Sequence, residues 1–335
     1  MPPYRIAVQG ATTLLGKELH AALGARHFPA LPAVLVAAPA ASAAEERTLA
    51  EVGEEAAVLE PCTRETLAGC QAVFLAGTAA EAQAVAALAP ESAALVDLSG
   101  GLGEPAREAG GTLLTGLEAK GAAADATTSA RVLLPAHPAA QVLAHLLERL
   151  QLAGRLQTAV ATVFEPVSQR GWAGVQELQQ QSLRLLSMQS LPQETFDAQV
   201  AFNLRARLGE KAQPSLGSVR RRIAAEVAAL GAPVAPALSV FQAPVFHASM
   251  VSLYVRFAGA VALEAVLGVL TSPWLTPSAE YPDMVTTAGT DTIPLGPVRR
   301  DETGGYWLLA GVDNLRRTAF SAADAALAWL GARNL

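Results

Sequence analysis

Three side chains of the types that perform acid–base chemistry follow predicted strands in the second and third quarters of the chain: His137, Glu165 and His247. Imidazole and carboxylate groups that share one cleft can serve in hydrolysis or proton transfer, and both can bind a metal. The alternative interpretation is that all three are residues of strand corners with no shared chemistry. We therefore treat them as candidates for altered chemistry, and we predict no metal site.

The corner that carries His137 is predicted from residues 131–150. Two prolines, Pro135 and Pro138, interrupt the chain after a short apolar strand, because proline has no N–H group and a fixed φ. Pro138 suits the first position of a helix, and apolar residues recur at helical spacing beyond it. His137 is then the predicted N-cap, where a side chain faces the free N–H groups of the first turn and any anion that they bind.

A glycine-rich turn near the N-terminus predicts a dinucleotide site of weakened affinity. A strand, this turn and a helix are the context in which a pyrophosphate sits on a helix N-terminus. The middle position of the glycine pattern is Thr13, whose side chain would crowd a phosphate, and residues 37–41 contain neither an acid nor an arginine for the adenosine ribose. An ordinary strand-to-helix turn is the alternative. The candidate cofactor-binding residues are Gly10, Thr12, Thr13, Gly16 and Gly77.

The order of predicted elements indicates an α/β protein with two domains. Strands at 6–8, 33–38, 71–75 and 93–98 alternate with helical segments, which predicts a doubly wound parallel sheet. The second half has more strands and fewer, longer helices, which predicts a mixed sheet of α+β type. Its expected strands cover 158–164, 237–241, 251–257 and 304–309, and its last helix covers 319–330.

The composition excludes several classes of protein. The chain has 335 residues, of which 51% are hydrophobic and 16% charged, and its net charge of −6 does not suit a nucleic-acid partner. We find no pattern typical of a signal peptide or a membrane span, so we expect a cytoplasmic protein. Cys62 and Cys70 are too few for a disulfide framework, and we expect both to be packing or surface residues.

Over nearly its whole length the chain resembles the aspartate-β-semialdehyde dehydrogenase family, as a degenerate, Usg-like member. The resemblance implies a Rossmann-type dinucleotide-binding domain at 1–131, completed by a C-terminal helix at 314–335. It implies an α+β catalytic and dimerisation domain at 132–313, and therefore a homodimer. The residues that carry the resemblance are Gly10 to Thr12, Gly16, Ala76-Gly77, Asp97 to Ser99, Pro135 to His137, Pro166 to Ser168, Pro244 to Phe246 and Val312 to Arg317.

The resemblance also implies which positions would carry the family's NADP-dependent reductive dephosphorylation of an aspartyl phosphate. The cysteine nucleophile falls on His137, and the glutamine that orients the intermediate falls on Glu165. The base histidine falls on Ser249, for which His247 would stand in if both lie on one strand face. The anion-binding arginines fall on Gln242 and Gly103, and Arg222 is the one residue expected to remain for a substrate anion.

These substitutions leave three hypotheses. A cysteine thiolate adds to an aldehyde and gives a thioester, a step that hydride can reverse. An imidazole adds poorly to an aldehyde, and an acyl-imidazole would hydrolyse. We therefore favour a non-catalytic dimeric paralogue. Such a protein would bind NADP or NAD weakly or not at all, and its small-molecule ligand is unknown. The alternatives are an NAD(P)-dependent oxidoreductase or hydrolase that uses His137, Glu165 and His247, or a dehydrogenase with the family's unchanged activity.

Overall fold

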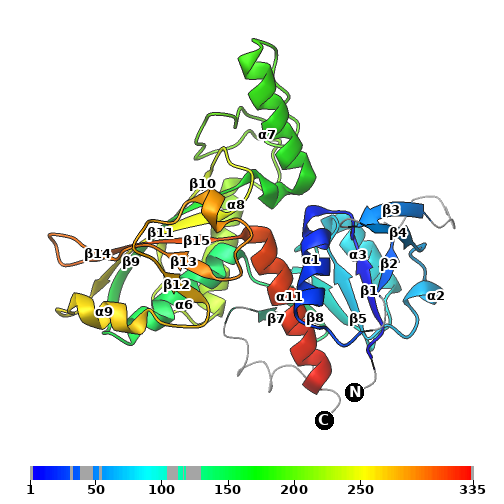
Figure 1. Cartoon of the computed structure of the whole chain (residues 1–335), viewed down its shortest axis with the longest axis horizontal. Helices are drawn as coiled ribbons and strands as arrows, with labels where there is room; N and C mark the ends of the chain where they lie inside the picture. The colour runs from blue at the N-terminus through cyan, green and yellow to red at the C-terminus, as the bar shows by residue number, and fades with distance from the viewer. Residues whose placement is uncertain are drawn as a thin grey trace. The chain divides into compact units, whose positions relative to one another are not determined.

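The computed structural model describes residues 3–30, 33–37, 48–52, 55–103, 112–115, 117 and 130–332. The chain forms two compact units (Figure 1). The N-terminal unit comprises Met1–Ala136 and Thr318–Leu335, and the C-terminal unit comprises His137–Arg317. Among the described residues, no helix has the length and apolar character needed to cross a membrane.

The N-terminal unit contains a six-stranded sheet in which every pair of neighbouring strands is parallel. Parallel strands covered on both faces need apolar residues in succession, and β5 supplies them: Phe74 packs into one core and Val73 and Leu75 into the other. The strands, in sheet order, are β2 (Val34–Val36), β1 (Ile6–Gln9), β5 (Ala72–Leu75), β6 (Ala94–Asp97), β8 (Val132–Pro135) and β7 (Thr112–Thr115).

Helices cover both faces of this sheet. On one face, α11 packs with Phe320 and Trp329 in the core, and Trp329 Nε1 donates to the carbonyl of Ala130 at 2.8 Å. The first residues of α11 belong to the C-terminal unit and the rest to the N-terminal unit. The helices are α1 (Leu14–Ala25), α2 (Arg64–Leu67), α3 (Ala79–Leu88) and α11 (Asn314–Ala332); a separate antiparallel pair is β3 (Thr48–Val52) with β4 (Glu55–Leu59).

The C-terminal unit contains a mixed sheet of seven strands. Its centre is antiparallel, with β11 between β9 and β15, and parallel pairs lie at both edges. The strands are β10 (Ala237–Gln242), β9 (Leu156–Glu165), β11 (Ser249–Phe257), β15 (Tyr306–Val312), β13 (Ile293–Leu295) and β12 (Leu275–Pro277), with β14 (Arg299–Arg300) also on β15.

Helix α6 packs on one face of this sheet and buries its apolar stripe against β9, β11 and β15. Helix α7 projects from the same unit (Figure 1). The helices of this unit are α6 (Pro138–Gln151), α7 (Gly171–Leu186), α8 (Leu216–Ala229), α9 (Leu263–Val269) and α10 (Met284–Thr287), and a 3₁₀ turn, η1 (Val167–Arg170), precedes α7.

These two sheets confirm the predicted fold class, a parallel α/β domain followed by an α+β domain. The sequence missed β7 and the β3–β4 pair, because these short segments lack a clear β-branched pattern. Two boundaries affect the candidate residues. Strand β9 extends to Glu165, and α11 begins at Asn314.

Candidate functional site

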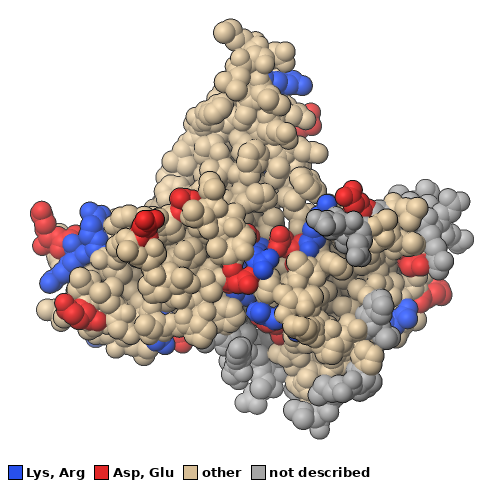
Figure 2. All heavy atoms as spheres, in the orientation of Figure 1, with Lys and Arg blue, Asp and Glu red and all other residues tan. Residues whose placement is uncertain are grey.

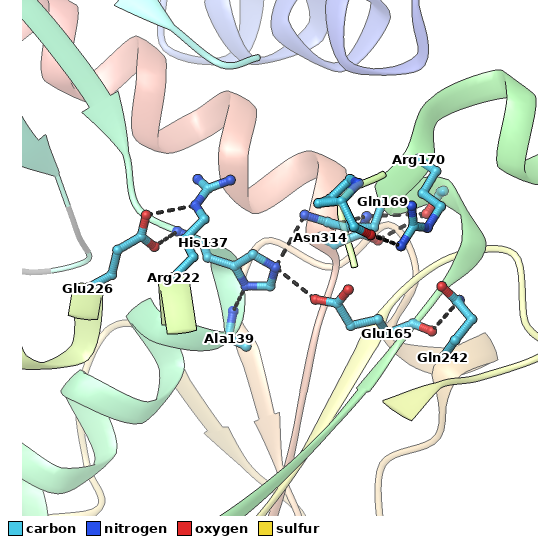
Figure 3. Close-up of polar contacts among 11 residues, drawn as sticks. His137, Ala139, Glu165, Gln169, Arg170, Arg222, Glu226, Gln242 and Asn314 are labelled. Atoms are coloured by element: carbon cyan, nitrogen blue, oxygen red, sulfur yellow. Dashed lines mark hydrogen bonds and ion pairs between the residues drawn. The ribbon is translucent and has the colours of Figure 1, made fainter. Parts of the chain in front are cut away.

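His137 lies where the sequence predicts it, as the N-cap of α6 with Pro138 at the start of the helix. The imidazole Nδ1 accepts a hydrogen bond from the N–H of Ala139 at 3.2 Å (Figure 3). One of the two ring nitrogens is therefore occupied by the backbone of the first helical turn.

The other ring nitrogen faces Glu165. Nε2 of His137 lies 2.8 Å from Oε1 of Glu165, and both side chains are buried, with 2% and 3% exposed. The two atoms are at ion-pair distance, but Oε1 accepts no aligned hydrogen bond, so the contact is mainly electrostatic. Since Glu165 ends a strand whose alternate side chains are buried, β9 itself aims the carboxylate inward. The structure thus brings two of the three candidates together.

His247 does not join them. It precedes β11, and Ala248 between it and the strand has a φ of +67°. The expectation that His247 shares a strand face with Ser249 is therefore wrong, because strand alternation does not extend across that turn. His247 makes no hydrogen bond or ion pair with the described residues, while Ser249 is fully buried and its hydroxyl has no partner there.

A short network orients a third polar group toward His137. The N–H of Ala248 donates to Oδ1 of Asn314 at 3.2 Å, which leaves the Asn314 amide nitrogen to donate to Oε1 of Gln169 at 3.0 Å. The amide nitrogen of Gln169 then lies 3.3 Å from Nε2 of His137 (Figure 3). Ala139, Glu165 and Gln169, whose polar groups contact the His137 ring, belong to the same unit as His137.

A carboxylate of the chain occupies the anion position at the start of α6. Oε2 of Glu226, on α8, accepts from the backbone N–H of His137 at 2.6 Å, and Oε1 accepts from Nε of Arg222 at 2.8 Å. The Glu226 side chain is 1% exposed and that of Arg222 is 44% exposed. Arg222, the expected substrate-anion residue, therefore already has an internal counterion.

The positions to which the resemblance assigns the anion-binding arginines are Gln242 and Gly103. Gln242 binds backbone carbonyls, and Gly103 adjoins open space. Gln242 is buried, and its amide nitrogen donates to the carbonyls of Glu165 and Ala243 at 2.9 and 3.2 Å. A Cβ added at Gly103 would find its nearest neighbour 4.0 Å away, on Leu134. Neither position offers a charged group to an anion.

The polar residues of the run at 312–317, one of the motifs that carry the resemblance, have separate structural roles. Oδ1 of Asp313 accepts from the N–H of Arg316 at 2.9 Å and so caps α11. Asn314 does not cap the helix, because its amide is used in the network described above. Arg316 pairs with Asp291, an acid of its own unit.

The candidate cofactor residues lie at the carboxyl edge of the parallel sheet, on two turns that we call the crest (residues 10–16 and 76–81). Gly10 has a φ of +78°, and a Cβ there would lie 2.5 Å from the nitrogen of Gly77. A Cβ on Gly16 would lie 2.1 Å from the carbonyl oxygen of Gly10. Thr13 caps α1, and Thr12 is exposed. Both glycines are thus required by the close approach of the chain to itself.

Neither cysteine lies in this C-terminal unit. Cys62 precedes α2 and Cys70 precedes β5, both in the N-terminal unit. Burial raises the pKa of the Cys62 thiol to about 11, and burial also raises the pKa of Cys70. Both thiols are therefore protonated at neutral pH, where a nucleophile must be a thiolate. Among the described residues, no three His, Cys, Asp or Glu side chains are grouped as metal ligands.

Comparisons with known proteins identify the family. Residues 147–317 match the family model described as the semialdehyde dehydrogenase dimerisation domain. A USG-1 protein homolog of Pseudomonas aeruginosa is 32% identical over 338 residues, 95% of this chain and 94% of that protein. A second USG-1 protein homolog, from Azotobacter vinelandii, is 30% identical over 80% of this chain and 78% of its own length.

The chain is a Usg-like member of the aspartate-semialdehyde dehydrogenase family.

Solved structures agree with this assignment. A probable aspartate-semialdehyde dehydrogenase from P. aeruginosa has a TM-score of 0.78 and 29% identity, covering 96% of this chain and 97% of that one. Aspartate semialdehyde dehydrogenase II from Vibrio cholerae has a TM-score of 0.81 over 99% of both chains. Its identity is 19%, so it supports the fold alone.

Two residues of the site, Glu226 and Gln169, were not predicted from the sequence. Glu226 lies four residues after Arg222 in a helix, a spacing that predicts an ion pair and could have shown that Arg222 is already matched. Gln169 follows the Pro166 to Ser168 motif directly, but nothing in the sequence indicates that its amide turns toward His137.

Proposed function

We propose that this member of the aspartate-semialdehyde dehydrogenase family has lost the family's NADP-dependent chemistry and acts as a dimeric, non-catalytic paralogue. The observation that carries the proposal is the state of His137, at the position to which the resemblance assigns the nucleophile. Nδ1 of the ring faces the N–H of Ala139, and Nε2 faces the buried Glu165 carboxylate and the Gln169 amide. Both ring nitrogens are therefore directed at groups of the chain itself, and a substrate would have to displace one of these groups to reach either nitrogen.

The surroundings of His137 support the same proposal. The backbone N–H at the corner, which could stabilise a developing oxyanion, already donates to Glu226. Arg222, the residue expected to remain for a substrate anion, pairs with the same carboxylate. The alternative of changed acid–base chemistry is disfavoured because His137 and Glu165 are both buried, and His247 makes no hydrogen bond or ion pair with either of them in the part of the chain that the structure describes.

The proposal is tested by assaying the purified protein with aspartate semialdehyde, phosphate and NADP, and in the reverse direction with NADPH. We expect turnover at least about 10⁴-fold below that of a functioning family member assayed alongside, because losing one member of a linked catalytic set removes that much rate. Turnover within about a hundredfold of that reference enzyme would overturn the proposal.

The proposed homodimer is supported by the sheet face of the C-terminal unit that α6 does not cover. Val160, Tyr254 and Trp307 form one row across β9, β11 and β15, and the Tyr254 and Trp307 rings lie 4.9 Å apart. Val160 is 41% exposed and Trp307 is 38% exposed. Beside them, Phe164 stacks on Phe241. Contiguous apolar side chains on one sheet face are typical of an interface between subunits.

Further exposed apolar side chains are Leu186 at the end of α7, with Met188 and Phe202 in the segment that follows this helix. Figure 2 shows that this projection bears few charged groups on the face in view. We place it, with the sheet face, among the surfaces of the proposed dimer.

Replacing Val160 by arginine is expected to raise the dissociation constant of the dimer at least about tenfold, because a charge would be buried in the apolar row. Sedimentation velocity over a dilution series measures this. The matched control is Leu152→Arg, at a 65% exposed position directly after α6, the helix on the opposite face of the sheet. A Val160→Arg protein that remains as dimeric as the control would exclude this face.

A further inference from the structure

The crest of the N-terminal sheet, residues 10–16 and 76–81, is where a dinucleotide would place its pyrophosphate. In parallel α/β sheets that site is built from the backbone N–H groups of a glycine-rich turn and of helix N-termini, together with glycines that let the phosphates approach closely. Whether the crest suits such a ligand therefore depends on which N–H groups and which space remain available.

Four N–H groups on the crest are already used by the chain. Thr13 N–H donates to the carbonyl of Gly10 at 3.0 Å, and Gly16 N–H donates to the Thr13 hydroxyl oxygen at 2.9 Å. Gly77 N–H donates to Oε1 of Gln9 at 3.1 Å, and Thr78 N–H donates to Oε2 of Glu81 at 2.8 Å. A phosphate would have to displace these acceptors before it could use the same donors.

The space beside Gly77 is also filled. A Cβ built on Gly77 would lie 2.0 Å from the amide nitrogen of Gln9 and 2.3 Å from Oε2 of Glu81. These two atoms are 3.1 Å apart and hydrogen-bonded, so they bridge the end of β1 and the start of α3. The glycine therefore makes room for the chain's own side chains instead of for a ligand.

The Thr13 hydroxyl reinforces this closure. Besides accepting from Gly16, Oγ1 lies within hydrogen-bond distance of the carbonyls of Gly10 and Ala76, at 2.8 and 2.9 Å. This contact ties the glycine-rich turn to the neighbouring turn that follows β5. A glycine at position 13 would make none of these contacts.

The charge of the crest opposes a phosphate as well. The Glu81 carboxylate is held on the N-terminus of α3, where a phosphate would otherwise be favoured. The N-terminal unit as a whole has 9 Lys and Arg residues against 16 Asp and Glu. The residues present therefore do not fit the NADP that the fold family implies.

We propose that Glu81, held by Gln9 over Gly77, takes the place of a dinucleotide phosphate on the crest and excludes pyrophosphate-containing cofactors from this chain. Glu81 is the residue that determines this exclusion, and Thr13 strengthens it by closing the turn. The inference rests on the proposed loss of dehydrogenase chemistry, but it concerns binding and is tested without substrate.

The test is a titration of the full-length protein with NADPH, followed by NADPH fluorescence and repeated with inorganic pyrophosphate as a competitor. The wild type is expected not to saturate below about 1 mM. Glu81→Gln keeps an acceptor for Thr78 but removes the like charge, and it is expected to bind at least about tenfold more tightly. The double variant Thr13→Gly with Glu81→Gln is expected to bind more tightly still.

Glu65→Gln is the matched control, because Glu65 is an exposed acid in the first turn of α2 in the same unit but away from the crest. It is expected to behave as the wild type, and circular dichroism establishes that each variant is folded. Micromolar NADPH binding by the wild type, a Glu81→Gln protein no better than the wild type, or an equal gain in Glu65→Gln would each overturn the inference. Turnover by the wild type would overturn both proposals, whereas an unimproved Glu81→Gln variant of an inactive protein would overturn only this one.

Discussion

Replacing Glu226 by alanine is expected to lower the free energy of unfolding of the C-terminal unit by about 3 kcal/mol. The carboxylate is 1% exposed and accepts from the His137 N–H and from Arg222. Its loss leaves the N–H at the start of α6 without an acceptor, which accounts for most of the effect. The ion pair with Arg222 contributes less, because that side chain is 44% exposed and solvent screens it.

Urea denaturation followed by tryptophan fluorescence measures this change, and two variants separate its causes. Glu226→Gln keeps an oxygen acceptor for His137 and should cost about half as much. Glu210→Ala removes a 90% exposed acid that pairs with Arg207 at 3.6 Å, and should leave the unfolding curve unchanged. If Glu226→Ala were as stable as Glu210→Ala, the carboxylate would not be the anion that occupies this helix start.

Replacing His137 by cysteine is expected not to restore the family's activity. Turnover should remain at least about 10⁴-fold below that of a functioning family member, because the other members of the catalytic set are still absent. The introduced thiol would lie beside the buried Glu165 carboxylate. The backbone N–H of the introduced cysteine would still donate to Glu226. Two neighbouring carboxylates disfavour the thiolate on which such chemistry depends.

The rate of alkylation by iodoacetamide between pH 6 and pH 9, roughly the range over which thiols titrate, tests that explanation separately from turnover. The double variant His137→Cys with Glu165→Gln removes one of the two carboxylates, and its introduced thiol should react about tenfold faster at neutral pH than in the single variant. The wild type serves as the background, since Cys62 and Cys70 both have a raised pKa. Robust turnover by the single variant would show that the family's roles were assigned to the wrong positions.

The sequence by itself determined the elements and the ancestry of this protein. Local rules suffice for these, because proline positions, helical spacing and apolar strands depend on neighbouring residues alone. They predicted His137 as the N-cap of α6 and the parallel sheet around β1 and β5, and the structure confirms both. The recurring motifs indicated the family, which the comparisons confirm.

The tertiary structure alone decided which groups meet, because those contacts join residues that are far apart in the chain. Only the fold shows that Glu226 occupies the start of α6, that Glu165 faces His137 and that His247 does not. The same holds for Glu81, which a local rule reads as a capping residue and which the fold places against Gln9. Sequence spacing indicates which chemistry a side chain could perform. Buried charged and polar groups, however, find their hydrogen-bond and ion-pair partners on distant segments of the chain, and those partners determine which side chains remain available for a ligand.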